Sequence, residues 1–173
     1  MENVAYADDS KPLFNSVGHA ITWALAIHCK QSVKITSIYS KSKGHDHGAA
    51  GEFETAAQAA IIIRTVELLE EKQRLALYMK YLPRNGGWNK IKIATASRLA
   101  ELIESIYSSE AVSAAICWGS RVSGFGIHKV GTTCRKRLFE SRRFAKEVTA
   151  QVQDIQADAE NVLYIKFSEK GLV

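Results

Sequence analysis

The chain has 173 residues, of which 46% are hydrophobic and 24% are charged, a composition typical of a globular protein with one domain, or one domain and an appendage. Its formal net charge of +5 favours polyanionic partners such as nucleic acids. The three cysteines form no CxxC pair, which argues against a disulfide framework and a zinc ribbon. The sequence has no signal-peptide pattern, which argues against secretion. It also has no apolar run near the roughly 18 residues that span a bilayer, which argues against membrane association. We therefore expect a cytoplasmic protein.

The N-terminal half reads as a tail followed by helices. Residues 1–15 are mostly polar, and we expect a flexible tail there. Apolar residues at helical spacing predict helices over 16–30, over about 55–69 and over 71–82. The sequence PRNGG at 83–87 joins a proline to two glycines and predicts that the last of these helices stops there.

Two more helical segments and a turn follow. The periodic apolar residues of 89–107 predict one helix or two short ones, and a serine pair before Glu110 predicts a capped helix over 110–118. The three glycines of GSRVSGFG at 119–126 predict a turn.

Apolar or small residues recur in steps of four and three along the C-terminal part of the chain. This seam consists of Cys134, Leu138, Ser141, Ala145, Val148, Val152, Ile155, Ala159 and Val162. Its heptad spacing, with no proline or glycine across 132–170, predicts one continuous helix from 128 to about 160 with Leu138 buried and Arg135 and Arg137 exposed. It also predicts a homodimer through 148–162, unless an intramolecular partner such as the 16–30 helix covers the seam.

The start of this last helix is strongly basic. Seven basic residues lie between positions 129 and 146, and Glu140 is the acidic residue in that span. On a helix of about 3.6 residues per turn, they spread over the surface that the seam leaves free. Arginine side chains suit phosphate oxygens and guanine edges, and a glycine-rich turn lets the following helix enter a groove. The predicted nucleic-acid contacts are Lys129, Thr132, Thr133, Arg135, Lys136, Arg137, Arg142, Arg143 and Lys146. A solvated charged face and an RNA-binding face are the alternatives.

Two segments carry a resemblance to a known family. LEEKQRLALYMKYL at 69–82 has its matching positions at Leu69, Glu71, Gln73, Arg74, Leu77, Met79, Tyr81 and Leu82. GIHKVGTTCRKRLFESR at 126–142 has them at Gly126, Ile127, Thr133, Arg135, Arg137, Leu138 and Arg142. They resemble the opening helix and the turn with recognition helix of region four of sigma-70-type transcription factors, and diverged versions of it in phage and prophage late-gene regulators and antiterminators. Glu70 stands where that family usually has proline, and about 44 residues separate the two segments, so an insertion over 89–118 is expected.

The expected fold is all-α: a multi-helix domain with an interrupted helix-turn-helix and a long C-terminal helix. We divide the chain into the tail at 1–15, a helical DNA-binding domain at 16–150 and a C-terminal helix extension at 151–173. The resemblance implies a DNA-binding transcriptional regulator, with RNA polymerase as a further candidate partner. The alternative is a non-enzymatic helical adaptor whose basic face binds an acidic protein partner.

Catalytic and metal-binding patterns are weak. His45 and His47 of the GHDHG loop have no third clustered ligand, so we expect no metal site. Cys117 and Cys134 are expected to be small buried residues, since only His128 could serve either as a base. The glycines of VSGFG do not follow a strand and lack the phosphate-loop pattern. We therefore expect neither an enzyme nor a cofactor.

Overall fold

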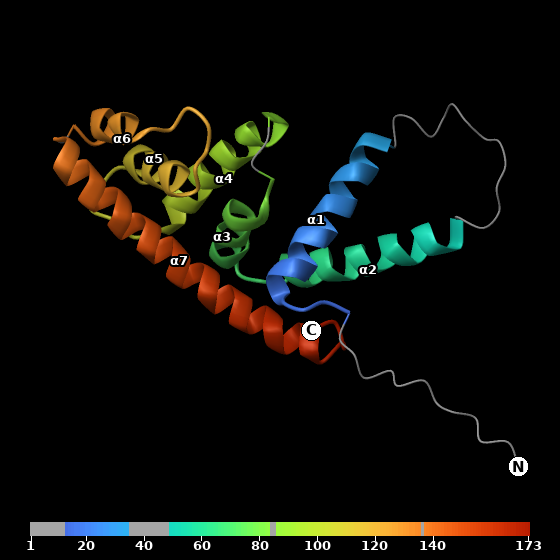
Figure 1. The fold of residues 1–173 in the computed structure, drawn as a ribbon. Coiled ribbons are helices and arrows are strands. Elements are labelled where there is room, and N and C mark those ends of the chain that lie inside the picture. The colour runs from blue at the N-terminus through green and yellow to red at the C-terminus, as the bar shows by residue number, and fades with distance from the viewer. Residues whose placement is uncertain (1–12, 35–48, 84–85, 136) are drawn as a thin grey trace, which may run out of the picture. The chain divides into compact units, whose positions relative to one another are not determined.

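The computed structural model describes residues 13–34, 49–83, 86–135 and 137–173 (Figure 1). Within these ranges the protein is all-α, as the sequence predicts, and no strand is present. None of the described helices is both long and apolar enough to cross a lipid bilayer. The elements are α1 (Val17–Lys34), α2 (Ala49–Glu67), α3 (Glu71–Tyr81), the short 3-10 helix η2 (Gly86–Trp88), α4 (Asn89–Leu102), α5 (Ser109–Gly119), α6 (Ile127–Cys134) and α7 (Leu138–Ser168).

The local sequence signals locate most of these helices correctly. The segment predicted at 71–82 forms α3, and α3 ends at Tyr81, just before the proline of PRNGG. The periodic residues of 89–107 and the capped segment at 110–118 correspond to α4 and α5. Ser108 caps α5 as predicted, because its side-chain oxygen accepts a hydrogen bond from the Ala111 amide at 3.4 Å. The GHDHG loop lies outside the described residues.

The described chain forms two compact units. The central unit is Val66–Ala159, and the terminal unit joins the residues up to Thr65 to Glu160–Val173. These borders differ from the sequence-based division at 15 and 150, because the last turns of α7 belong with the N-terminal helices.

The flexible tail expected at 1–15 extends too far, because Phe14 is part of the folded structure. Phe14 is buried, its ring centroid lies 5.1 Å from that of Trp23, and its amide donates a hydrogen bond to the Leu172 carbonyl at 2.9 Å. These contacts fix the start of the terminal unit to the end of the chain. Residues 1–12 lie outside the described residues.

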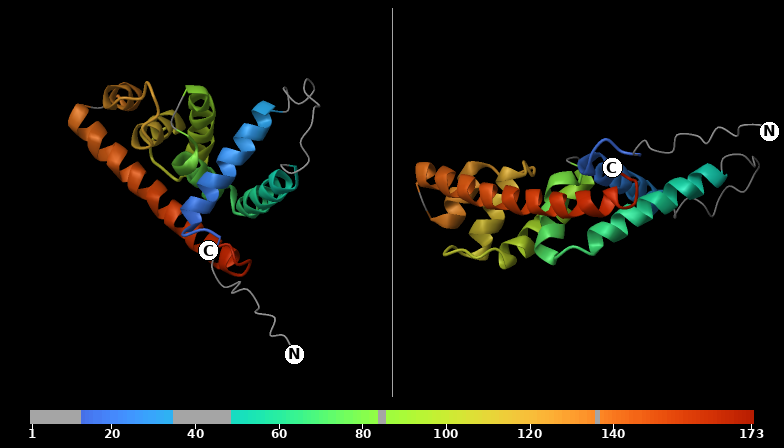
Figure 2. Two further views of the ribbon diagram at one scale, coloured as in Figure 1. Left: turned by 45° about the vertical axis from the view of Figure 1, so that its right-hand side comes forward. Right: turned by 90° about the horizontal axis from the view of Figure 1, so that it is seen from below.

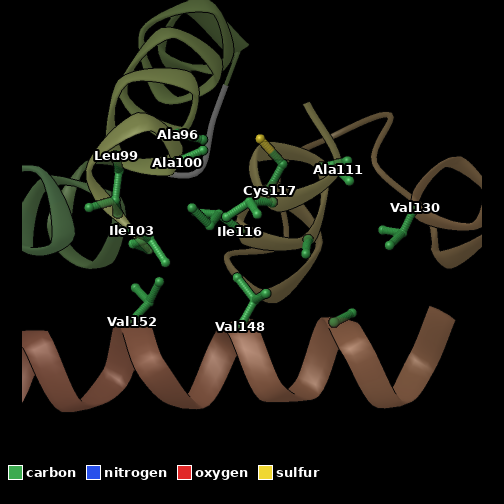
Figure 3. Close-up of a cluster of buried hydrophobic side chains, with 14 of the residues drawn as sticks. Ala96, Leu99, Ala100, Ile103, Ala111, Ile116, Cys117, Val130, Val148 and Val152 are labelled. Carbon is green, nitrogen blue, oxygen red and sulfur yellow. The ribbon is translucent and has the colours of Figure 1, made fainter. Parts of the chain in front are cut away.

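The core of the central unit lies between α7 and the helices α4, α5 and α6 (Figure 3). Val148 and Val152 extend from α7 towards Ile116 of α5 and Ile103 at the end of α4, and all four side chains are buried. Burial of one such side chain contributes about 1.5–3 kcal/mol. This apolar contact holds α4 and α5 against α7.

One glycine allows α5 and α7 to approach closely. A Cβ atom added at Gly119 would lie 2.4 Å from Oγ1 and 3.0 Å from Cγ2 of Thr149. Thr149 cannot easily turn aside, because its hydroxyl donates a hydrogen bond to the Ala145 carbonyl at 2.7 Å. The position therefore requires a residue without a side chain.

The prediction of one continuous helix from 128 to about 160 is wrong. α6 ends at Cys134, Arg135 adopts a left-handed conformation with φ 53° and ψ 37°, and α7 begins at Leu138. The Arg135 amide donates hydrogen bonds to the carbonyls of Gly131 and Thr132, and a left-handed residue at this position ends a helix. Beyond the break, α7 continues without interruption to Ser168 (Figure 2).

Part of the seam is buried within the chain itself. Val148 and Val152 belong to the core of the central unit, and Ala159 is fully buried. Val148 and Val152 pack against α4 and α5, whereas the sequence suggested the 16–30 helix as the intramolecular partner of the seam. The water-exposed apolar stripe that motivated a homodimer through 148–162 is therefore absent at these positions, and dimerisation itself stays a prediction.

A buried polar contact generates the first test. Gln156 of α7 is buried and its Nε2 donates a hydrogen bond to the Ala76 carbonyl of α3 at 2.9 Å. We predict that Gln156→Ala lowers the free energy of unfolding by about 1–2 kcal/mol, since the bond and its packing are both lost. Urea denaturation measures this. Gln151→Ala, at an exposed position of the same helix, should change stability by less than about 0.5 kcal/mol, and equal effects of the two variants would contradict the prediction.

The close approach of α5 and α7 leads to a second testable prediction. Gly119→Ala should destabilise the protein by about 1–3 kcal/mol, because the new methyl group overlaps Thr149. In a Thr149→Ala background the same substitution should cost much less, which a double-mutant cycle measures as a favourable coupling energy. Gly87→Ala is the control, because a Cβ atom there would have no neighbour within 4 Å. Additive effects at 119 and 149 would refute the proposed overlap.

Candidate nucleic-acid interface

The helices α5 and α6 contact each other within the central unit and are joined by a turn at 120–126 (Figure 1); this pair of helices is called the helix-turn-helix below. After α5, the Val122 amide donates a hydrogen bond to the Cys117 carbonyl at 2.9 Å, and the Arg121 amide donates one to the Trp118 carbonyl at 3.0 Å. This pair of bonds is a Schellman motif, which closes a helix and redirects the chain. Val122 is buried, so the turn is fixed to the core and α6 is held in place beside α5.

The short helix α6 has one apolar and one polar side. Val130 is fully buried, and Ile127 and Cys134 pack against the same core while remaining partly accessible. The opposite side exposes polar groups, among them Lys129 and Thr132. The second helix of a helix-turn-helix is the one that enters a DNA groove, and here that helix presents a cation and a hydroxyl to solvent.

The structure places nearly all the predicted contact residues on the surface. The exposed residues are Lys129 and Thr132 of α6, Arg135 and Arg137 at the joint (the break between α6 and α7), and Arg142, Arg143 and Lys146 of α7. Thr133 is half-buried. Lys136 lies outside the described residues. The exposure predicted for Arg135 and Arg137 is therefore confirmed. The contacts do not share one helix, however: those before the break follow α6, and those after it follow the first three turns of α7.

Most of these cations have no acidic partner. Among the described residues, Arg143 pairs with Glu147 at 3.0 Å, one helical turn away, whereas Arg135, Arg137, Arg142 and Lys146 form no ion pair. The Nζ atom of Lys129 lies 4.1 Å from the ring centroid of Phe125, a cation–π contact that leaves its charge uncompensated. The surface therefore carries cations whose charge an anionic ligand can neutralise.

Leu138 was expected to be buried, and this expectation is wrong. Its side chain is 41% exposed, and that of the next residue, Phe139, is 80% exposed. The break at Arg135 makes Leu138 the first residue of α7, so the seam reaches the core one turn later, at Ser141. Phe144, two turns into α7, is buried in the core, with its ring centroid 4.3 Å from that of Tyr107.

Arg121 belongs to the same basic surface, although it was not among the contact residues predicted from the sequence. Arg121 is exposed and has a φ of 55°; Arg135 is the other non-glycine residue with a positive φ among the described residues. Both arginines end a helix of the helix-turn-helix, at positions that glycine usually occupies. Arg121 and Lys146 line an open groove of about 440 Å³ between the end of α5 and α7. The glycine-rich context of GSRVSG was the only sequence signal, and it marked the turn without marking the arginine.

Other chemically active side chains give little support for catalysis. Cys117 is fully buried, and burial raises the pKa of its thiol to about 11, so it stays protonated and unreactive near neutral pH. Cys134 is half-buried, as are Trp23, Trp88 and Trp118. No group of three or more potential metal ligands occurs among the described residues.

No family model, curated protein or solved structure matches this chain. The geometry and charge of the helix-turn-helix are the observations from which a function can be inferred.

The left-handed arginine at the joint generates the third test. A left-handed conformation costs a residue with a Cβ atom about 1–2 kcal/mol, and glycine avoids this cost. The greater flexibility of glycine in the unfolded chain cancels part of that gain. We predict that Arg135→Gly is more stable than Arg135→Ala by about 0.5–1 kcal/mol in chemical denaturation. An alanine variant as stable as the glycine variant would show that position 135 is not strained.

Proposed function

We propose that the protein is a DNA-binding transcriptional regulator of the phage or prophage type that acts in the cytoplasm. The observation that carries this proposal is the unpaired basic surface on the second helix of a helix-turn-helix and on the helix that follows. α6 would enter the major groove, with Lys129 and Thr132 near base edges. Arg137, Arg142 and Lys146 would contact backbone phosphates on either side.

The arrangement of α3 adds support from a different part of the chain. In a module of the sigma region-four type, the opening helix and the recognition helix share a core. Ala76 and Met79 of α3 lie in the same buried cluster as Val130 of α6, and α4 and α5 connect them through successive packing contacts. The insertion between the two segments thus forms helices that join them. RNA polymerase is a candidate partner on the strength of the resemblance alone.

The cap of α6 is also suited to an anion. Its N-cap residue is Gly126, which provides no side-chain cap. The partial positive charge at the start of the helix is therefore available to a phosphate group. Lys129 lies in the same first turn, and no acidic residue is present there, so the local field favours a negatively charged ligand.

The proposal predicts salt-sensitive binding of mixed-sequence duplex DNA in a mobility-shift assay. Each neutralised phosphate contributes about −0.9 to the slope of log K against log salt concentration. Replacing Arg137 and Arg142 by alanine should weaken binding and make the slope shallower by about two. Replacing Lys72 and Lys90, exposed lysines of α3 and α4, removes the same charge and should leave the slope unchanged.

The opposite outcome separates the two candidate functions. An adaptor for an acidic protein would bind duplex DNA weakly at about 150 mM salt, and its residual binding would fall equally with either pair of substitutions. That result would reject the DNA-binding function.

A further inference from the structure

We propose that Phe139 is a stacking platform for an unpaired DNA base. The inference rests on the proposed DNA-binding function and deepens it, because it names the state of the DNA that the surface prefers. Phe139 is 80% exposed, in contrast to Phe14, Phe144 and Phe167, which are buried in the described structure. An aromatic ring exposed this far leaves much apolar area in water.

The ring of Phe139 lies outside the buried cluster formed by the described residues of the central unit. Phe144 lies five residues further along α7 and packs against Tyr107. Five residues correspond to a rotation of about 140° around an α-helix, so Phe139 extends away from the side that Phe144 buries. Because α7 begins at Leu138, no preceding turn of α7 covers the ring.

Phe139 heads a basic row on the surface of α7. Arg142, Arg143 and Lys146 follow it at three, four and seven residues, and this spacing places all of them on one side of the helix. Proteins that bind single strands combine aromatic rings, which stack on bases, with cations that follow the phosphates. The positive charge of the row therefore selects a nucleic acid as the occupant of the exposed ring.

An intact duplex satisfies this surface only partly. The cations can reach its phosphates, but the faces of its bases are stacked on one another and closed to the ring. A single strand, or a duplex opened locally, presents a free base face. The basic row and the ring of Phe139 together therefore fit DNA whose bases are unpaired where the ring contacts them.

The experiment compares one mixed-sequence oligonucleotide as a labelled single strand and as an intact duplex, with full-length protein and fluorescence anisotropy. Phe139→Ala should weaken binding to the single strand by roughly 5- to 100-fold and binding to the duplex by less than about 2-fold. It should not change the salt slope, because no charge is removed. Phe139→Trp should retain the affinity, since it keeps a stacking surface.

Two controls separate stacking from charge and from general apolar exposure. Arg142→Ala should weaken binding to both forms of DNA and flatten the slope on the single strand by about 0.7. Ile106→Ala removes a side chain that is 94% exposed outside the basic row, and it should change neither affinity. Circular dichroism of each variant verifies that it is folded.

Unchanged single-strand affinity in Phe139→Ala, or equal losses on both forms of DNA, would overturn the stacking inference while leaving the DNA-binding function intact. Failure of the unmodified protein to bind either form would overturn the proposed function as well. If Phe139→Ala instead lost only its affinity for a polyglutamate peptide, the ring would belong to a protein-docking surface, and the inference would be wrong.

Discussion

The packing of α4 and α5 on the inner side of α7 is the contact on which the central unit depends. Val148 and Val152 provide apolar area, and Gly119 lets the backbone of α5 reach Thr149. Once α5 is fixed in this way, its Schellman turn directs the chain into α6, whose own apolar side returns to the same core through Val130. The polar side of α6 is therefore exposed as a consequence of the packing beneath it.

The two left-handed arginines show what this arrangement costs. Each costs about 1–2 kcal/mol in backbone conformation, a substantial amount against a total stability of about 5–15 kcal/mol. Glycine would perform the same turn with less strain. Arg121 and Arg135 instead place a long cation at the end of each helix of the helix-turn-helix, and strained residues that persist are often found at functional sites. The strain is thus consistent with the binding role inferred from charge.

Sequence periodicity was sufficient for the regular elements and failed at the joint. The apolar spacing located α3, α4 and α5, and the heptad seam identified Val148 and Val152 as buried. No proline or glycine stands at the break, and the left-handed conformation of Arg135 that ends α6 is visible only in the folded chain. The exposure of Leu138 follows from that break. Charge composition alone identified most of the basic surface, since cations without acidic neighbours in sequence remained unpaired in space.

The packing of seam residues against helices of the same chain affects how the protein would recognise DNA. A homodimer reads two half-sites, and its affinity comes from both. Val148 and Val152 are committed to the intramolecular core and provide no dimer contact, and each α6 has only two turns with which to read a site. Affinity would then come mainly from phosphate contacts, which carry no sequence information. Such a protein gains selectivity more readily from the state of the DNA than from its sequence, and an exposed aromatic ring beside the cations is a device that distinguishes paired from unpaired bases.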